Sequence, residues 1–506
     1  MKRKILFLIA LFIAIIANAQ SYKVNLDATL NDDFKKMKEG SKVKISRIIH
    51  NEILDDYNNL RNEFLIVMDK DTIQYSDRFV QSLDFTYDNI QDLWDQKIIC
   101  NVLDELESKG VQESLRSEME EEALDFINKQ KTYGLEFNDP YLESYIYSLI
   151  SKIAPKTLID SRPGNVNLLI LENPSMNASM YSNGTLVINT GLLSALHSED
   201  ELVAVLAHEI AHFILDHSVQ NVNAAVARKK RAEFWAGLAT GLTALAEGVA
   251  ATKSSYYIPG AATLGMAALS TTIAHQVVDR LGMKYNIEQE EEADKTAIQA
   301  LEILGYDKNA LSSALNRMRS VMTQERSHVM YFQSYTHPAL VKRIQDAGRP
   351  QDISSSDFER EISFAVTSTA RMKFEDRRFR QVLPLVEQNI NNGVATAEDY
   401  ILKAHCLLSL HNDSQSNTEV LDMVNMAKSL DESNINIYKA EILANLRLEK
   451  HIVAQELLSK YIQRLNEMEL SLKEIESDRA WDNTHNFISI ERNWAKRMIV
   501  KVRAMQ

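Results

Sequence analysis

The sequence predicts a mainly α-helical chain with a small β-sheet, in which a domain built around one amphipathic helix precedes an array of helical repeats. Three observations support this fold class. An amphipathic stretch at Ser198–His217 contains an H-E-x-x-H motif. Short β-prone runs precede that stretch, and an acidic helical stretch follows it. The chain from residue 360 to 506 is helical and repetitive.

Residues 1–19 have the pattern of a secretory signal peptide. The basic Lys2-Arg3-Lys4 is followed by the apolar Ile5–Ile16 and then by Ala17-Asn18-Ala19, whose small residues suit cleavage. We therefore expect an exported protein, located in the periplasm or associated with the cell envelope, with secretion as the alternative.

Composition sets further limits on the 506 residues, a length that suggests about three domains. A hydrophobic share of 45% and a charged share of 25% are typical of globular proteins. The net charge of −14 argues against a nucleic-acid partner. With only two cysteines, Cys100 and Cys406, the chain is no disulfide scaffold, and we expect both to be buried thiols.

We interpret residues 20–134 as a mainly helical region of unknown role and residues 135–350 as the domain that carries the chemistry. Within this domain, the mostly apolar Val166–Leu171 predicts a strand. Ser175–Thr190 predicts a hairpin, because the turn residues Ser182-Asn183-Gly184 precede the β-prone Thr185–Ile188.

The stretch at Ser198–His217 predicts one amphipathic helix with Ser198 as its N-cap. His208 and His212 are one turn apart and project only about 40° from each other. One face can therefore present two imidazoles to a single Zn²⁺, and the adjacent Glu209 can accept a proton from water at the metal. His217 has rotated about 500° past His212, so we expect a residue of the helix end and not a ligand.

A catalytic zinc site needs a third protein ligand and one open position. The best source is Glu288–Asp294 (EQEEEAD), which continues into Lys295–Leu304 with helical periodicity. Glu290 and Asp294 are again four residues apart on one face. An acidic run of this kind is by itself more typical of a solvated helix face, but the histidine helix upstream favours a ligand.

These motifs together resemble the M48-type zinc metallopeptidases, which are gluzincins. The resemblance rests on HEIAHFILDH at 208–217 followed by EEEAD at 290–294, on the strand, hairpin and helix entry at 176–209, on a leading helix at 138–155 and on THPALVKRI at 336–344. It extends from about residue 135 to residue 349. In this family the edge of the small sheet borders the cleft, where an extended peptide could pair with it.

The resemblance implies a role for each matching residue. His208, His212 and Glu290 would bind one Zn²⁺ per chain, and Glu209 would act as the general base. Asp294 would orient a ligand histidine from outside the metal's own ligand set.

His337 falls where the family places a histidine near the cleft. Pro338 disfavours helix at His337, which predicts a loop position. Three roles remain open: a donor to the oxyanion (a tyrosine is the other candidate), a ligand that keeps the enzyme latent, and a surface histidine without a catalytic role.

Residues 233–275 form an insertion rich in Ala, Gly and Thr, with apolar stretches at Phe234–Ala251 and Ile258–Ile273. A helical hairpin packed on the domain is the favoured interpretation. Peripheral contact with a membrane and two membrane spans are the alternatives, although small residues provide a weak drive for insertion.

The region from 360 to 506 predicts tetratricopeptide-like helical repeats. Units begin near Ser363, Ala397 and Ile435, the first two about 34 residues apart. A loop insertion at Asp413–Asn417 would explain the longer second interval. An ordinary array of α-hairpins is the alternative, and either architecture offers a concave surface to a protein partner.

We therefore expect an exported zinc-dependent endopeptidase that hydrolyses protein substrates, in envelope protein quality control, with the repeats recruiting the substrate. The alternative is a repeat-based interaction protein or chaperone whose zinc site is latent.

Overall fold

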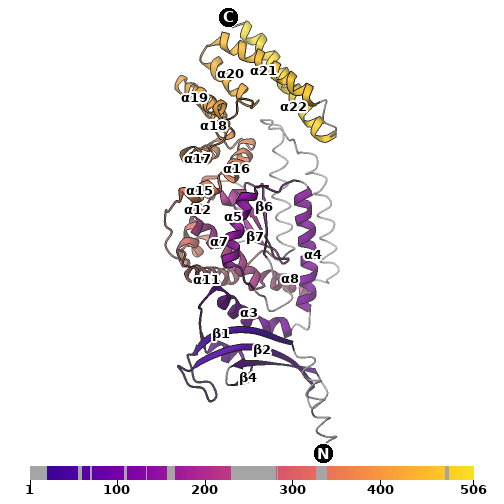
Figure 1. Ribbon diagram of the computed structural model, residues 1–506, viewed down its shortest axis with the longest axis vertical. Coiled ribbons are helices and arrows are strands. Elements are labelled where there is room, and N and C mark those ends of the chain that lie inside the picture. Colours follow the sequence, from indigo (N-terminus) through magenta and orange to yellow (C-terminus); the bar gives the residue numbers. More distant parts are fainter. Residues whose placement is uncertain are drawn as a thin grey trace, which may run out of the picture.

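The computed structural model describes residues 20–54, 60–68, 71–107, 111–132, 134–156, 166–228, 281, 283–325, 339–472 and 478–505. Figure 1 shows three parts that follow one another along the long axis: a β-sheet at one end, a central domain, and an array of helices at the other end. The predicted signal peptide, the insertion at 233–275 and His337 lie outside the described residues.

The N-terminal part is a five-stranded antiparallel sheet, so the prediction of a mainly helical region is wrong for residues 20–86. Its order is β4-β3-β2-β1-β5. The strands are β1 (Gln20–Leu30), β2 (Lys42–Leu54), β3 (Leu60–Met68), β4 (Thr72–Gln74) and β5 (Leu83–Thr86), with the short helix α2 (Asp77–Gln81) before β5. Val24, Leu26, Ala28 and Leu30 are buried and alternate with polar residues. This period of two is the strand signal that the helical interpretation overlooked.

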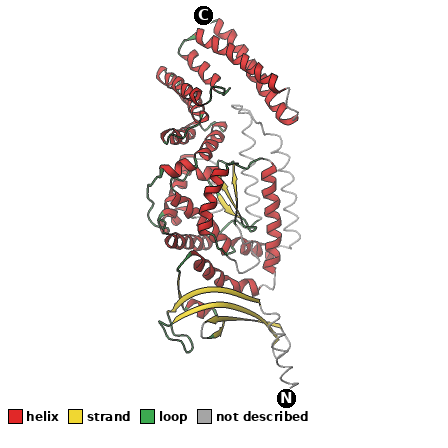
Figure 2. Ribbon diagram, in the orientation of Figure 1, coloured by secondary structure: helices red, strands yellow, loops and turns green. Residues whose placement is uncertain are grey.

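Two helices connect this sheet to the central domain, α3 (Ile90–Glu107) and α4 (Val111–Thr132). Trp94 of α3 is fully buried and donates from Nε1 to the carbonyl oxygen of Ile153, at 2.6 Å. Figure 2 shows α4 running along one side of the central domain.

The central domain combines a three-stranded sheet with helices. Its elements are α5 (Pro140–Ile153), β6 (Asn167–Leu171), β7 (Ala178–Met180), β8 (Thr185–Asn189), α6 (Thr190–Leu193), α7 (Glu199–Ile214), α8 (His217–Arg228), α11 (Ile287–Leu304), α12 (Ala310–Glu325) and α14 (Leu340–Asp346). The predicted strand and hairpin are confirmed. β8 lies in the middle, parallel to β6 and antiparallel to β7, which leaves β7 at an edge.

Helix α7 is the centre of this domain. The Ser198 hydroxyl accepts a hydrogen bond from the Glu201 amide, as its predicted N-cap role requires. Every residue from Glu201 to Ile214 is buried, because the helix is covered by neighbouring elements on all sides. Among the described residues, no single helix is long and apolar enough to cross a membrane; α7 and His217–Val226 meet the criteria of length and composition only as a pair bent by 43°.

The C-terminal part is helical throughout its described residues. Its helices are α15 (Ser356–Glu361), α16 (Ser363–Glu375), α17 (Phe379–Asn391), α18 (Ala397–Leu410), α19 (Ser414–Leu430), α20 (Ile437–Arg447), α21 (His451–Leu472) and α22 (Asp478–Arg503). Sequential neighbours pack on one another. The first two predicted unit starts coincide with the starts of α16 and α18. The third lies two residues before the start of α20. The shared positions Ala370, Ala404 and Ile442 are all fully buried.

One detail of this part differs from the sequence interpretation. The proposed loop insertion at Asp413–Asn417 is wrong, because Asp413 caps α19 and the following residues form its first turn. The longer interval comes mainly from the helix itself, which has 17 residues where α17 has 13. Cys406 is a buried free thiol, as expected, and burial raises its pKa to about 12.

The boundary between the central domain and the helical array is not sharp. Phe358 of α15, Ile362, and Ala365 and Val366 of α16 belong to the same hydrophobic core as α7 and α11. The first helices after residue 350 are thus part of the central domain's packing as well as the start of the array.

Candidate metal centre

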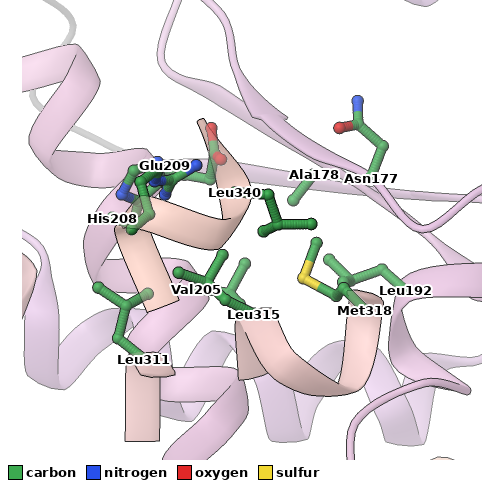
Figure 3. A pocket seen from close by; sticks show the side chains of 11 residues that line it. Asn177, Ala178, Leu192, Val205, His208, Glu209, Leu311, Leu315, Met318 and Leu340 are labelled. Atoms are coloured by element: carbon green, nitrogen blue, oxygen red, sulfur yellow. The ribbon is translucent and has the colours of Figure 1, made fainter. Parts of the chain in front are cut away.

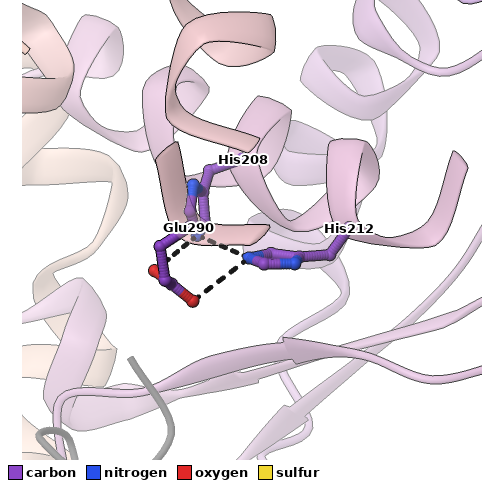
Figure 4. A group of neighbouring side chains, drawn as sticks. All are labelled: His208, His212 and Glu290. Atoms are coloured by element: carbon purple, nitrogen blue, oxygen red, sulfur yellow. Dashed lines mark hydrogen bonds and ion pairs between the residues drawn. The ribbon is translucent and has the colours of Figure 1, made fainter. Parts of the chain in front are cut away.

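Three potential metal ligands converge between α7 and α11. The Nε2 atoms of His208 and His212 are 3.0 Å apart. Glu290 lies opposite them, with Oε2 3.7 Å from the His208 Nε2 and Oε1 3.5 Å from the His212 Nε2. Figure 4 shows the carboxylate facing both imidazoles. All three side chains are buried, and the potential ligand atoms lie within 4.8 Å of one another.

This donor set fits a tetrahedral metal ion. With bonds of about 2.0–2.1 Å, tetrahedral geometry separates neighbouring donors by about 3.3 Å. The three observed separations of 3.0, 3.5 and 3.7 Å bracket that value. Two neutral imidazoles and one carboxylate are a ligand set that catalytic zinc sites use. These residues could therefore hold a metal ion, and their chemistry suits zinc.

Asp294 lies one turn after Glu290 on α11 and contacts the other nitrogen of His208, with Oδ1 2.9 Å from Nδ1. Because an ionised carboxylate can only accept, His208 carries its proton on Nδ1 and directs its Nε2 lone pair toward Glu290. Burial alone would raise the pKa of Asp294, but Arg343 and His208 together hold that pKa down at about 2. Asp294 is thus a permanent anion that orients His208.

Arg343 of α14 compensates the buried carboxylates. Its Nε and Nη2 each donate to Asp294 at 2.7 Å, and its Nη1 lies 2.5 Å from Glu290 Oε2. The side chain is almost fully buried. Two buried carboxylates without a cation would destabilise the folded state. The positive charge of Arg343 therefore compensates the negative charges of Asp294 and Glu290.

His212 is enclosed by aromatic and imidazole rings. Tyr285 stacks on its face with ring centroids 3.7 Å apart, and Nδ1 lies 2.8 Å from Nδ1 of His217. Burial lowers the pKa of His212 well below its usual range, and the neighbouring histidines lower it further against the opposing effect of Glu290. His212 is therefore neutral, which is the state that binds metal.

Glu209 faces the sheet. Its Oε2 accepts a hydrogen bond from the backbone amide of Met180 in β7, at 3.2 Å, and the side chain is buried. Beside Glu209 and His208 lies an apolar pocket (Figure 3). Its other lining residues are Asn177, Ala178, Leu192, Val205, Leu311, Leu315, Met318, Leu340 and Arg343.

The structure brings together His208, Glu209, His212, Glu290 and Asp294, all selected from the sequence, while His337 is outside the described residues. Two neighbours of these residues, Arg343 and His217, make contacts that the sequence patterns do not predict. Arg343 was noted only as part of THPALVKRI, although two carboxylates on one buried helix face signal the need for a cation. His217 lies beyond the end of α7 and outside the group of three potential ligands, as expected, but its ring faces His212 where the helical rotation predicts that it turns away.

Comparison with known proteins shows which proteins the central domain is similar to. Residues 140–351 match the model of peptidase family M48. The beta-barrel assembly-enhancing protease of Escherichia coli K12 is 28% identical over 232 residues, covering 44% of this chain and 42% of that protein. The putative beta-barrel assembly-enhancing protease of Vibrio cholerae is 28% identical over 210 residues, covering 42% of this chain and 39% of that protein. The mitochondrial metalloendopeptidase OMA1 of Schizosaccharomyces pombe is 25% identical over 244 residues, covering 46% of this chain and 63% of that protein. The chain thus spans about two-fifths of the length of the first two relatives.

Proposed function

We propose that this chain, which carries an M48 peptidase domain at residues 140–351, is a zinc-dependent endopeptidase that hydrolyses protein substrates. The observation that carries the proposal is the convergence of His208, His212 and Glu290 beside a buried glutamate of the same helix, Glu209. One zinc ion per chain would be held by the first three residues.

In the proposed mechanism of hydrolysis, each of these residues has a separate role. Bound zinc would polarise the scissile carbonyl and lower the pKa of the attacking water. Glu209 accepts the proton of that water during attack and returns it to the leaving amine. Asp294 and Arg343 keep His208 and Glu290 oriented throughout, because their ion pair is buried and makes hydrogen bonds at two points.

An extended polypeptide fits the surroundings of Glu209. β7 is an edge strand, so a substrate can add to the sheet through its backbone. The Met180 amide that now bonds Glu209 shows how close this strand runs to the proposed base. The neighbouring pocket is lined mainly by aliphatic side chains, which favours an apolar residue next to the scissile bond.

The proposed setting is protein quality control in the periplasm or cell envelope. It is supported by the signal-peptide pattern of residues 1–19 and by the names of the relatives, which describe proteases that enhance β-barrel assembly. The helical array from α16 to α22 would recruit a protein substrate or partner, as tetratricopeptide-like repeats do. Peripheral membrane contact through 233–275 belongs to the same proposal.

A Glu209→Gln variant tests the proposal. It should lose hydrolysis of an unfolded protein substrate while keeping its zinc, because Glu209 is a base and not a ligand. Glu302→Gln, an exposed glutamate on α11, is the matched control and should behave as the wild type. Retained turnover by Glu209→Gln at full zinc occupancy would refute the role of the base. Full activity of Glu209→Gln in cells would favour the alternative, an interaction protein with a latent site.

A further inference from the structure

We propose that His217 and Glu292 are positioning residues that fix His212 in the tautomer a metal requires. The inference rests on the proposed zinc site and deepens it. It depends on a break in the helix that carries both histidines.

The break between α7 and α8 places the His217 ring next to the His212 ring. In a continuous helix, five residues would turn His217 about 140° away from His212. Instead α7 ends at Ile214, and Asp216 adopts a left-handed conformation with a φ of 57° before α8 begins at His217. The ring centroids of His212 and His217 are therefore only 4.9 Å apart, at an interplanar angle of 70°.

The hydrogen bonds among these groups allow one arrangement of protons when His217 is neutral. Nε2 of His217 is 3.4 Å from Oε2 of Glu292, an ionised carboxylate that can only accept. Nε2 of His217 therefore carries the proton, and its Nδ1 is an acceptor. Nδ1 of His212, 2.8 Å away, must then be the donor. That tautomer leaves the Nε2 lone pair of His212 directed at Glu290 and His208.

The two histidine ligands are thus oriented by different means. His208 has a carboxylate oxygen of Asp294 2.9 Å from its Nδ1, whereas the Nδ1 of His212 faces an imidazole, His217, which in turn faces Glu292. Tyr285 covers the face of His212 with its ring, and its hydroxyl pairs with Ser218, at 3.0 Å. Nδ1 of His212 instead lies 2.8 Å from Nδ1 of His217.

An ion pair from the N-terminal helices holds the break in place. Arg116 of α4 donates from Nη2 to Oδ2 of Asp216 at 2.7 Å, and the two side chains are 2% and 11% exposed. Leu115 and Met119 pack beside it on Val219 and Val222 of α8. A left-handed residue that is not glycine persists where the surroundings impose it, and this contact supplies that constraint.

The zinc affinity of the full chain, measured by competition with a chelator, tests the inference independently of proteolysis. His217→Phe keeps a ring of similar size but cannot accept a hydrogen bond, so zinc should bind about 10–100-fold more weakly. His217→Gln offers an amide oxygen to the His212 Nδ1–H and should restore most of the affinity. Glu292→Met should weaken binding less than His217→Phe, because it acts one bond further from the metal.

His405→Phe, which replaces a buried histidine of α18 far from the site, is the matched control and should leave zinc affinity unchanged. Thermal unfolding of the metal-free variants shows whether each is folded. Wild-type affinity in a folded His217→Phe variant would overturn the inference, and so would a His217→Gln variant as weak as His217→Phe. If His217→Phe does not fold, a folded His217→Gln with weak binding, or Glu292→Met with unchanged binding, overturns it. Absence of zinc from the wild-type chain would overturn the metal site itself.

Discussion

Arg343 and Asp294 form a buried two-point ion pair, in which Nε and Nη2 donate to the two carboxylate oxygens at 2.7 Å each. The same guanidinium reaches Glu290 through Nη1. One cation therefore compensates both the carboxylate that we assign to the metal and the carboxylate that orients His208. This arrangement leads to the first prediction.

Arg343→Gln should lower the free energy of unfolding of the metal-free chain by about 3–5 kcal/mol, because it leaves two buried carboxylates without their cation. Zinc affinity should fall in the same variant. Lys342→Gln is the matched control: Lys342 pairs with Glu291 at the surface, where solvent screens the pair, so its loss should change the free energy of unfolding far less than the loss of Arg343. Chemical denaturation of both variants makes the comparison. Equal effects at the two positions would contradict the role of Arg343.

Metal removal should separate the ligands from the base. The purified chain should contain about one zinc ion, lost on dialysis against a chelator, and His208→Ala should prevent reloading. Because metal binds only the folded state, its removal should also lower the melting temperature. Metal analysis and thermal unfolding measure the two effects. A folded, chelator-free preparation without zinc would count against the ligand set His208, His212 and Glu290.

Truncation should distinguish substrate recruitment from structural support. A chain that ends at residue 395 keeps α15 to α17 and should hydrolyse a short peptide at the wild-type rate but cleave a folded or aggregated protein more slowly. A chain that ends at residue 356 removes Phe358, Ile362 and Val366 from the central core and should lose both activities. Equal loss of both activities in the longer chain would make the array a structural support.

His337→Ala should lower turnover roughly 10²-fold with little change in zinc affinity if the histidine donates to the oxyanion. A latency role predicts higher basal activity instead, because a position on the metal opens. Turnover and zinc content of this variant decide between the two. Unchanged activity between about pH 6 and 8 would assign His337 to the surface and leave oxyanion support to another group.

Glu375 should make the junction between the central domain and the array sensitive to pH. Burial raises its pKa to about 7, opposed by Arg371 and assisted by the nearby charges of Asp376, Glu172 and Glu398. The folded state thus binds more protons than the unfolded state between the ordinary glutamate pKa, about 4.3, and pH 7. Stability should therefore fall as the pH rises through this window and remain lower above it.

Glu375→Gln cannot ionise and should remove this loss, raising stability at pH 8 by about 1–2 kcal/mol once solvent screening is allowed for. Urea unfolding at pH 5 and pH 8 measures the difference between variant and wild type. Glu387→Gln is the control, because the Glu387 side chain of α17 is 46% exposed and pairs with Lys403. The same pH dependence in Glu375→Gln and wild type would rule out Glu375 as its source.

Local patterns in the sequence were sufficient for the elements that depend on local rules. The cap at Ser198, the helical spacing of His208 and His212 and the hairpin around Gly184 all follow from neighbours within a few residues. The alternating residues of β1 carried an equally local signal for a strand. The choice of Glu290 and Asp294 needed more than spacing, because an acidic helix face is usually solvated, and it relied on resemblance to a family.

The tertiary structure decided the contacts that join distant segments or break a regular period. Arg343 reaches Asp294 only because α14 packs against α11, and no periodicity within either helix encodes that meeting. His217 reaches His212 because Asp216 leaves the helical conformation, held by Arg116 from a helix 100 residues away in the chain. A sequence specifies the face of a helix through residues one turn apart. Which segment packs against that face, and where the helix ends, depend on contacts with distant parts of the chain.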